Sequence, residues 1–105
     1  MKPEHFEQAL DLQLLALRDL MVDRQRKYGS TNITTSGVHG LLVRMSDKLA
    51  RIRHDHRNCL FSSCAELPAH PDEDALDAYR DLANYAGIIY PMLVTGQWGL
   101  PMLHP

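Results

Sequence analysis

The sequence lacks the positive charge, the long apolar runs and the repeats that mark several classes of protein. Its 105 residues carry 11 basic and 13 acidic side chains, with a net charge of −2. This balance argues against a non-specific DNA or RNA binder, because such domains are normally basic. The longest apolar stretch, "LANYAGIIYPMLVTG", is too short to span a bilayer and is interrupted by Pro91. We therefore expect one globular domain with no membrane segment.

Cysteines and targeting signals are also scarce. The two cysteines, Cys59 and Cys64, are weak evidence for a secreted disulfide framework. The opening "MKPEHFEQALDLQ" contains acids and no continuous apolar run, so we expect no secretory signal. These absences predict a cytoplasmic protein whose thiols are reduced.

What the sequence does contain is helical periodicity. An amphipathic helix is predicted over about residues 3–26, from apolar residues three and four apart at Phe6, Leu10, Leu14, Leu17 and Met21. A second helix is predicted from Ser36 or Gly37 to His54, with an apolar side at Leu41, Leu42, Met45, Leu49 and Ile52. A third is predicted from Pro71 or Asp72 to about Tyr90, where Pro91 ends or kinks it. The fold class is all-α: a small bundle of three main helices, with a long loop at 55–71 and a tail at 92–105 that has room for a short helix.

The predicted third helix carries an acidic stripe in "DEDALDAYRDLANY". Asp77 and Asp81 are four residues apart and so are neighbours on the helix surface, and Asn84 and Tyr85 continue the stripe. Carboxylate oxygens are the ligands that Mg²⁺ prefers, completed by waters and substrate phosphates. An ordinary solvated acidic face explains the same spacing equally well.

The predicted second helix carries a basic stripe in "VRMSDKLAR". Lys48 and Arg51 have the chemistry to bind phosphate oxygens, and Arg44 lies on the same side. Asp47 adds a metal ligand or orients these cations. Ion pairing within the helix is the simpler interpretation, because the four residues are three or four positions apart.

Two connecting segments also carry candidate residues. In "RKYGSTN", Tyr28 is suited to stacking on a base and Asn32 to hydrogen bonding with it, although a plain turn explains the segment as well. The loop that follows the second helix offers zinc-ligand residue types at His54, His56, Cys59, Cys64 and His70. Their spacing matches no common zinc-finger pattern, so zinc is the weaker interpretation.

The segments "RKYGSTN", "VRMSDKLARI" and "DALDAYRDLANYAGI", over about residues 26–89, together resemble the nucleotide-modification-associated domain of phages and bacteria. That family is related to the all-α nucleoside triphosphate pyrophosphatases of MazG type. The resemblance implies a helical bundle that assembles as a dimer or tetramer. It also implies that acids from two facing helices hold Mg²⁺ on a triphosphate, which water cleaves to a nucleoside monophosphate and pyrophosphate. Asp81 matches the aspartate that closes the third-helix metal motif. Asp77 lies one residue from the usual glutamate position, which here is Ala78, and Asp47 stands where a glutamate pair is expected.

The first hypothesis is therefore a Mg²⁺-dependent nucleotide pyrophosphohydrolase, with Mn²⁺ as an alternative metal. Its candidate catalytic residues are Asp81, Asp77 and Lys48, and its candidate metal ligands are Asp47, Asp77 and Asp81. Its candidate substrate-binding residues are Tyr28, Asn32, Arg44, Lys48, Arg51, Asn84 and Tyr85. The second hypothesis is a module that binds a nucleotide without cleaving it, and the third is a structural zinc-containing interaction domain. The first two imply a nucleotide partner and a homo-oligomer.

Overall fold

Apolar residues at helical spacing produce three long helices in the computed structural model, which describes residues 2–56 and 73–103. The long helices are α1 (Phe6–Tyr28), α2 (Thr31–Asp55) and α3 (Glu73–Asn84). A π-helical segment, η2 (Tyr85–Ile89), and a short helix, α4 (Tyr90–Val94), continue α3 directly. No strand occurs in these two described ranges. The predicted fold class, an all-α bundle, is confirmed.

The turn between α1 and α2 is tighter than the sequence pattern predicts. Gly29 ends α1 at a φ of 69°, a backbone conformation that L side chains rarely adopt, and its N–H donates to the Gln25 carbonyl at 2.9 Å. Helix α2 begins at Thr31, but the non-helical residue Gly37 divides it into two helices, and the longer one begins where the sequence predicts, after Gly37. In the short first part Ser36 Oγ donates to the Asn32 carbonyl one turn back at 3.0 Å, a contact that often accompanies a bend in a helix.

Gly37 interrupts the helical course of α2 and kinks it. Its φ of 61° and ψ of −157° lie in a region that is essentially restricted to glycine. The kink separates a short first part of α2 from the long straight part that carries the basic stripe. It allows the first part to turn back toward the end of α1.

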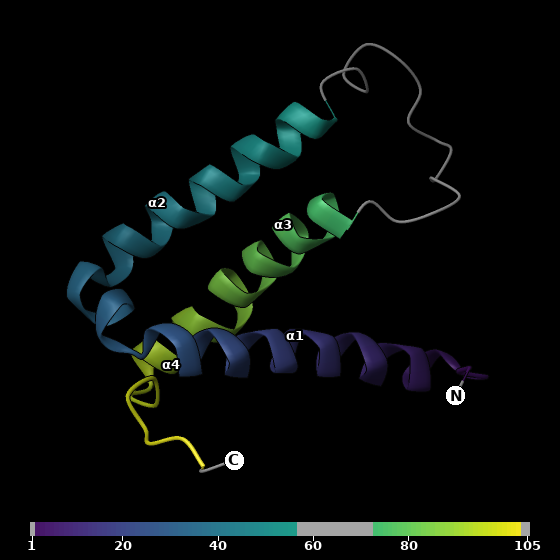
Figure 1. Cartoon of the computed structure of the whole chain (residues 1–105), viewed down its shortest axis with the longest axis horizontal. Helices are drawn as coiled ribbons and strands as arrows, with labels where there is room; N and C mark the ends of the chain where they lie inside the picture. The colour runs from purple at the N-terminus through teal and green to yellow at the C-terminus, as the bar shows by residue number, and fades with distance from the viewer. Residues whose placement is uncertain (1, 57–72, 104–105) are drawn as a thin grey trace.

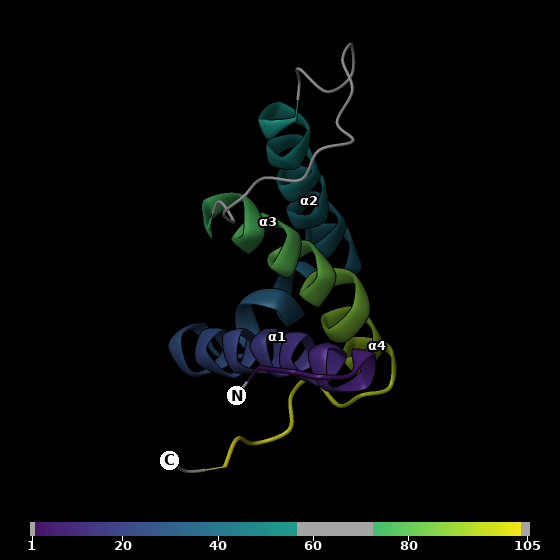
Figure 2. The same ribbon diagram turned by 90° about the vertical axis from the view of Figure 1, so that its right-hand side faces the viewer.

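The three long helices form a packed pair, α2 and α3, and a third helix, α1, that crosses this pair. Helices α2 and α3 pack against each other, and α1 crosses below them in both views (Figures 1 and 2). A small hydrophobic core forms from Ile33 and Leu41 of α2, Ile89 of η2 and Trp98, and Met21 of α1 packs against it. The core therefore lies at one end of the bundle, beside the kink in α2.

The helical course that begins with α3 reaches Ile89 at the end of η2, close to the predicted end near Tyr90. The short helix α4 follows directly to Val94, with Pro91 in its first turn, and it is the short helix for which the sequence left room. Before Pro91, the Tyr90 N–H bonds to the Tyr85 carbonyl and opens a π-helical turn. Part of the predicted tail is thus helical.

The apolar side of α1 is largely exposed in this single chain. None of the residues of α1 is fully buried, and the exposed fractions of Phe6, Leu10 and Leu14 are 77%, 45% and 51%. Leu17 and Met21 are half-buried against the rest of the bundle. Within residues 2–56 and 73–103, no helix combines the length and the apolar character needed to cross a bilayer.

Candidate functional site

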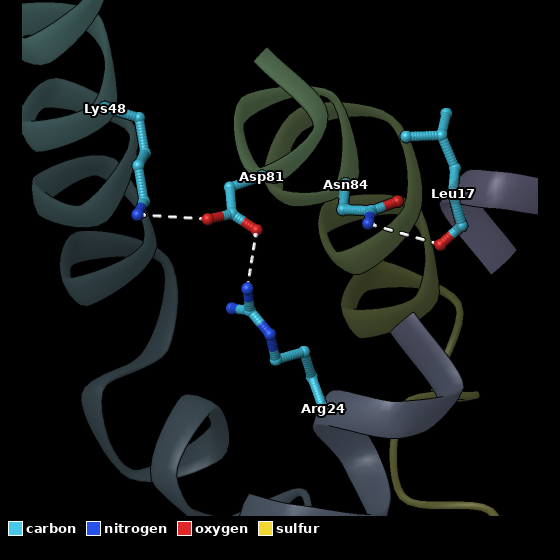
Figure 3. Close-up of polar contacts among 5 residues, drawn as sticks. All are labelled: Leu17, Arg24, Lys48, Asp81 and Asn84. Carbon is cyan, nitrogen blue, oxygen red and sulfur yellow. Dashed lines mark hydrogen bonds and ion pairs between the residues drawn. The ribbon is translucent and has the colours of Figure 1, made fainter. Parts of the chain in front are cut away.

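Asp81 is the most distinctive polar residue of the bundle, because it is a carboxylate buried between three helices. Its side chain is 8% exposed, and each of its oxygens contacts a different cation. Lys48 Nζ of α2 lies 3.0 Å from Asp81 Oδ2, and Arg24 Nη2 of α1 lies 3.5 Å from Asp81 Oδ1 (Figure 3). This arrangement ties α1, α2 and α3 together at one point, and removing one partner from such a buried group is costly.

A cavity of about 300 Å³ opens beside this ion pair. It lies between the end of α1, the first part of α2, the α3–η2 junction and Trp98. Its volume is at the lower end of the range for small-molecule sites, which is about 300–1,000 Å³. Six residues singled out from the sequence line it: Tyr28, Asn32, Arg44, Asp81, Asn84 and Tyr85. The structure therefore brings together, in one wall, residues from all three sequence motifs.

Arg44 is held in place at the mouth of this cavity by a second sequence-predicted residue. Its Nη2 donates to Asn32 Oδ1 at 3.0 Å. The contact joins the two parts of α2 across the kink at Gly37, and the side chain of Arg44 is only half-buried. A planar guanidinium fixed through one nitrogen keeps its other donors available for the oxygens of an anion such as a phosphate.

The amide of Asn84 forms part of the inner wall of the cavity. Asn84 is 3% exposed, and its Nδ2 donates to the Leu17 carbonyl of α1 at 3.3 Å (Figure 3). Its Oδ1 is buried and accepts no hydrogen bond from the described residues. A buried polar atom without a partner costs about 1–3 kcal/mol, so this oxygen is a candidate acceptor for a bound molecule or a water.

Three candidate residues lie away from the cavity. Asp47 and Arg51 are exposed on α2, and Asp77 is exposed on α3. On α3 the packed positions are Ala78 and Asp81, three residues apart, so Asp77 lies outside that contact. Lys48 does not line the cavity but reaches its wall through Asp81.

The predicted Mg²⁺ centre needs several acids in one place, and the described residues do not provide them. Asp81 is the single carboxylate in the cavity wall, and both of its oxygens face cations. Within residues 2–56 and 73–103, no three histidine, cysteine, aspartate or glutamate side chains form a group that could hold a metal ion. The donor set of the described chain therefore does not fit the predicted Mg²⁺ or Mn²⁺ site, and metal dependence stays a prediction.

The structure also adds residues that the sequence motifs did not reveal. Arg24 and Gln25 of α1 and Trp98 line the cavity with the predicted set. Trp98 is fixed by two hydrogen bonds: its Nε1 donates to the Ser30 carbonyl at 3.0 Å, and its carbonyl accepts from Gln25 Nε2 at 3.5 Å. Arg24 and Gln25 lie one helical turn before Tyr28, so the α-helical period from Tyr28 was a signal that would have found them.

Most of the candidate zinc ligands, including both cysteines and His70, lie outside the described residues. Of the two remaining histidines, His56 contacts α3, where its Nε2 lies 3.0 Å from the Tyr79 hydroxyl and the two rings meet edge to face. A search against protein families, curated proteins and solved structures found no match to this chain. The resemblance to MazG-type proteins therefore stays a prediction from the sequence.

Proposed function

We propose that the protein is a nucleotide-binding module whose ligand occupies the cavity beside Asp81. The observation that carries the proposal is the combination of residue types in one wall. Arg24 and Arg44 supply positive charge for a phosphate, and Tyr28 and Tyr85 supply aromatic rings for a base. Nucleotides combine an anionic group with a flat aromatic group, and both parts find matching side chains here.

The charges around the cavity favour an anion. Two arginines and one aspartate line it, and Lys48 contacts the same aspartate from outside. The local balance is therefore positive although the whole chain carries a net charge of −2. The amides of Asn32, Asn84 and Gln25 add groups that can both donate and accept hydrogen bonds, which suits the edge of a base.

Isothermal titration calorimetry with ribo- and deoxynucleoside mono- and triphosphates, and with inorganic tripolyphosphate, tests this proposal directly. We expect saturable binding of at least one nucleotide without added metal. The substitution Arg44→Gln should weaken that binding by about tenfold or more, since a charge-assisted hydrogen bond to phosphate contributes about 1.5–3 kcal/mol. Arg51→Gln is the matched control, because Arg51 is exposed on the same helix away from the cavity. Absence of binding to the whole panel would refute the proposal.

Nucleotide pyrophosphohydrolysis is the second candidate, and the presence of Asp81 in the cavity wall favours it. The bound phosphates would compete with this carboxylate for Arg24 and Lys48, which would leave its oxygens facing the substrate. Release of pyrophosphate from a nucleoside triphosphate, measured with and without Mg²⁺ or Mn²⁺, separates the two candidates. Turnover that Asp81→Asn abolishes would establish the enzyme in place of the binding module.

We also propose that the protein works as a homodimer or homotetramer in the cytoplasm. The small core supports assembly, because the described residues bury only six hydrophobic side chains. Sedimentation equilibrium of the purified full chain measures the assembly state, and a monomer over the accessible concentration range would rule this out.

A further inference from the structure

A broad groove on α1 differs from the candidate nucleotide site because its lining is mostly apolar. It has a volume of about 680 Å³ and runs between α1 and the chain that follows α4. Leu14 and Leu15 lie on the α1 side, with exposed fractions of 51% and 49%, and Met92 and Leu100 lie opposite. Contiguous exposed apolar surfaces of this kind mark interaction sites in soluble proteins.

The charges on this groove are arranged symmetrically about its two leucines. Asp11 lines the groove four residues before Leu15, and Arg18 lines it four residues after Leu14. At 100° and 1.5 Å per residue, Asp11 and Arg18 lie on the same face of α1, about 10 Å apart. The order along this face is therefore acid, two leucines, base. When an identical helix lies antiparallel to it, each acid faces a base.

We infer that α1 pairs with α1 of a second copy, antiparallel, across a two-fold axis between Leu14 and Leu15. In this register Asp11 of each copy faces Arg18 of the other, and the leucines pack at the centre. A two-fold interface is isologous, so every contact occurs twice. Moving the axis to residue 11 would oppose the two Asp11 side chains, and moving it to residue 18 would oppose the two Arg18 side chains. Charge complementarity therefore selects the register centred on the leucines.

Among residues 2–56 and 73–103, Arg18 has one ion pair, with its neighbour Asp19. Its Nη1 lies 3.6 Å from Asp19 Oδ1, and both side chains are about two-thirds exposed, at 69% and 65%. Exposed neighbouring pairs of this kind contribute little, so Arg18 can turn to a partner at small cost. The pairing would also cover Leu14 and Leu15, which are exposed in the single chain. The inference rests on the homo-oligomer proposed above and not on nucleotide binding.

Charge reversal in the full-length protein tests the register. The substitutions are Asp11→Arg, Arg18→Asp and the two together, and sedimentation equilibrium gives the dimer dissociation constant of each. Each single reversal places like charges together at two symmetric contacts, so we expect it to weaken the dimer by about tenfold, equivalent to about 1.4 kcal/mol. The double variant should return to within about threefold of the wild type, since it exchanges the two charges and restores both contacts.

An equimolar mixture of the two single variants provides a second readout. The heterodimer has an opposite charge at both contacts, so it should form about as well as the wild-type dimer while each variant alone dissociates. Asp23→Arg is the matched control: it makes the same charge change at an exposed position about 140° around α1 from Arg18 and should leave the dimer unchanged. Circular dichroism checks that all variants remain helical.

The possible failures are distinguishable. A monomeric wild type would overturn both the proposed assembly and this pairing. A wild-type dimer that is insensitive to both single reversals, or a double variant as weak as the singles, would overturn the pairing alone. Neither result would affect the nucleotide-binding proposal, because Asp11 and Arg18 do not line the nucleotide cavity.

Discussion

Replacing Asp81 with asparagine changes the charge of the cavity wall while keeping the shape of the side chain. The wild-type carboxylate contacts Lys48 Nζ at 3.0 Å and Arg24 Nη2 at 3.5 Å. A charge-assisted contact to a buried group contributes about 1.5–3 kcal/mol, and the contact to Arg24, which is 37% exposed, contributes about 1 kcal/mol or less. Because asparagine still accepts one hydrogen bond, we expect Asp81→Asn to lower the free energy of unfolding by about 2–3 kcal/mol. At about 4–8 °C per kcal/mol, Tm should fall by about 10–20 °C.

The same substitution should have the opposite effect on ligand affinity. In the proposed complex, Asp81 would compete with the phosphate of the ligand for Arg24 and Lys48. Removing its charge leaves those cations to the ligand, so we expect calorimetry below Tm to show nucleotide affinity raised by about three- to tenfold. A metal-dependent hydrolase predicts the reverse, because it would lose a metal ligand and with it turnover.

Asp77→Asn provides the matched control for both measurements. Asp77 is exposed and lies one helical turn before Asp81. Replacing its carboxylate with an amide should therefore change the free energy of unfolding by no more than about 0.5 kcal/mol and leave the nucleotide affinity unchanged. If Asp81→Asn left Tm unchanged, the ion pairs would not stabilise the fold as argued here. If it weakened nucleotide binding, the proposed competition between carboxylate and phosphate would be refuted.

Further predictions concern the backbone and the walls of the cavity. Gly37→Ala should lower the free energy of unfolding by about 1–3 kcal/mol in urea denaturation, because its φ of 61° and ψ of −157° disfavour a side chain. Gly87→Ala is its control and should be neutral or stabilising by up to about 1 kcal/mol, because it is helical and exposed and an added Cβ meets nothing within 4 Å. Trp98→Phe removes the indole donor to the start of α2 and should cost about 1 kcal/mol in the same assay. In the wild type, fluorescence of Trp98 should change on titration with a nucleotide, since it lines the cavity. Asn84→Ala removes the hydrogen bond that joins α3 to the Leu17 carbonyl of α1 and should lower Tm by about 5–10 °C.

The sequence was sufficient for the helical class and for much of the cavity wall. Apolar spacing located α1 to within a few residues, and the motif residues Tyr28, Asn32 and Arg44 do meet Asp81. The long part of α2 begins after Gly37, as predicted. The short helical stretch from Thr31 to Ser36 was missed because serine, threonine and glycine normally mark turns.

The acidic stripe shows why spacing does not fix the face of a helix that packs. Asp77 and Asp81 are neighbours on α3, but the buried face of this helix carries Ala78, whose exposed fraction is 0%, and Asp81, which contacts Lys48 of α2. That close contact places Asp81 inside and leaves Asp77 in solvent. The role of Arg24 depends on where α1 crosses α3, which is a property of the tertiary arrangement and has no local signal around residue 81.

The hydrogen bond from Trp98 to Ser30 has a consequence for the order in which the molecule is completed. It joins residues separated by 68 positions in the chain, and Trp98 also closes the cavity against Gln25. During synthesis α1 and α2 emerge well before this tryptophan, so the cavity beside Asp81 cannot be complete until the last described turns have left the ribosome. A nascent chain halted before residue 98 would contain the cationic residues of the cavity but not the indole that seals it.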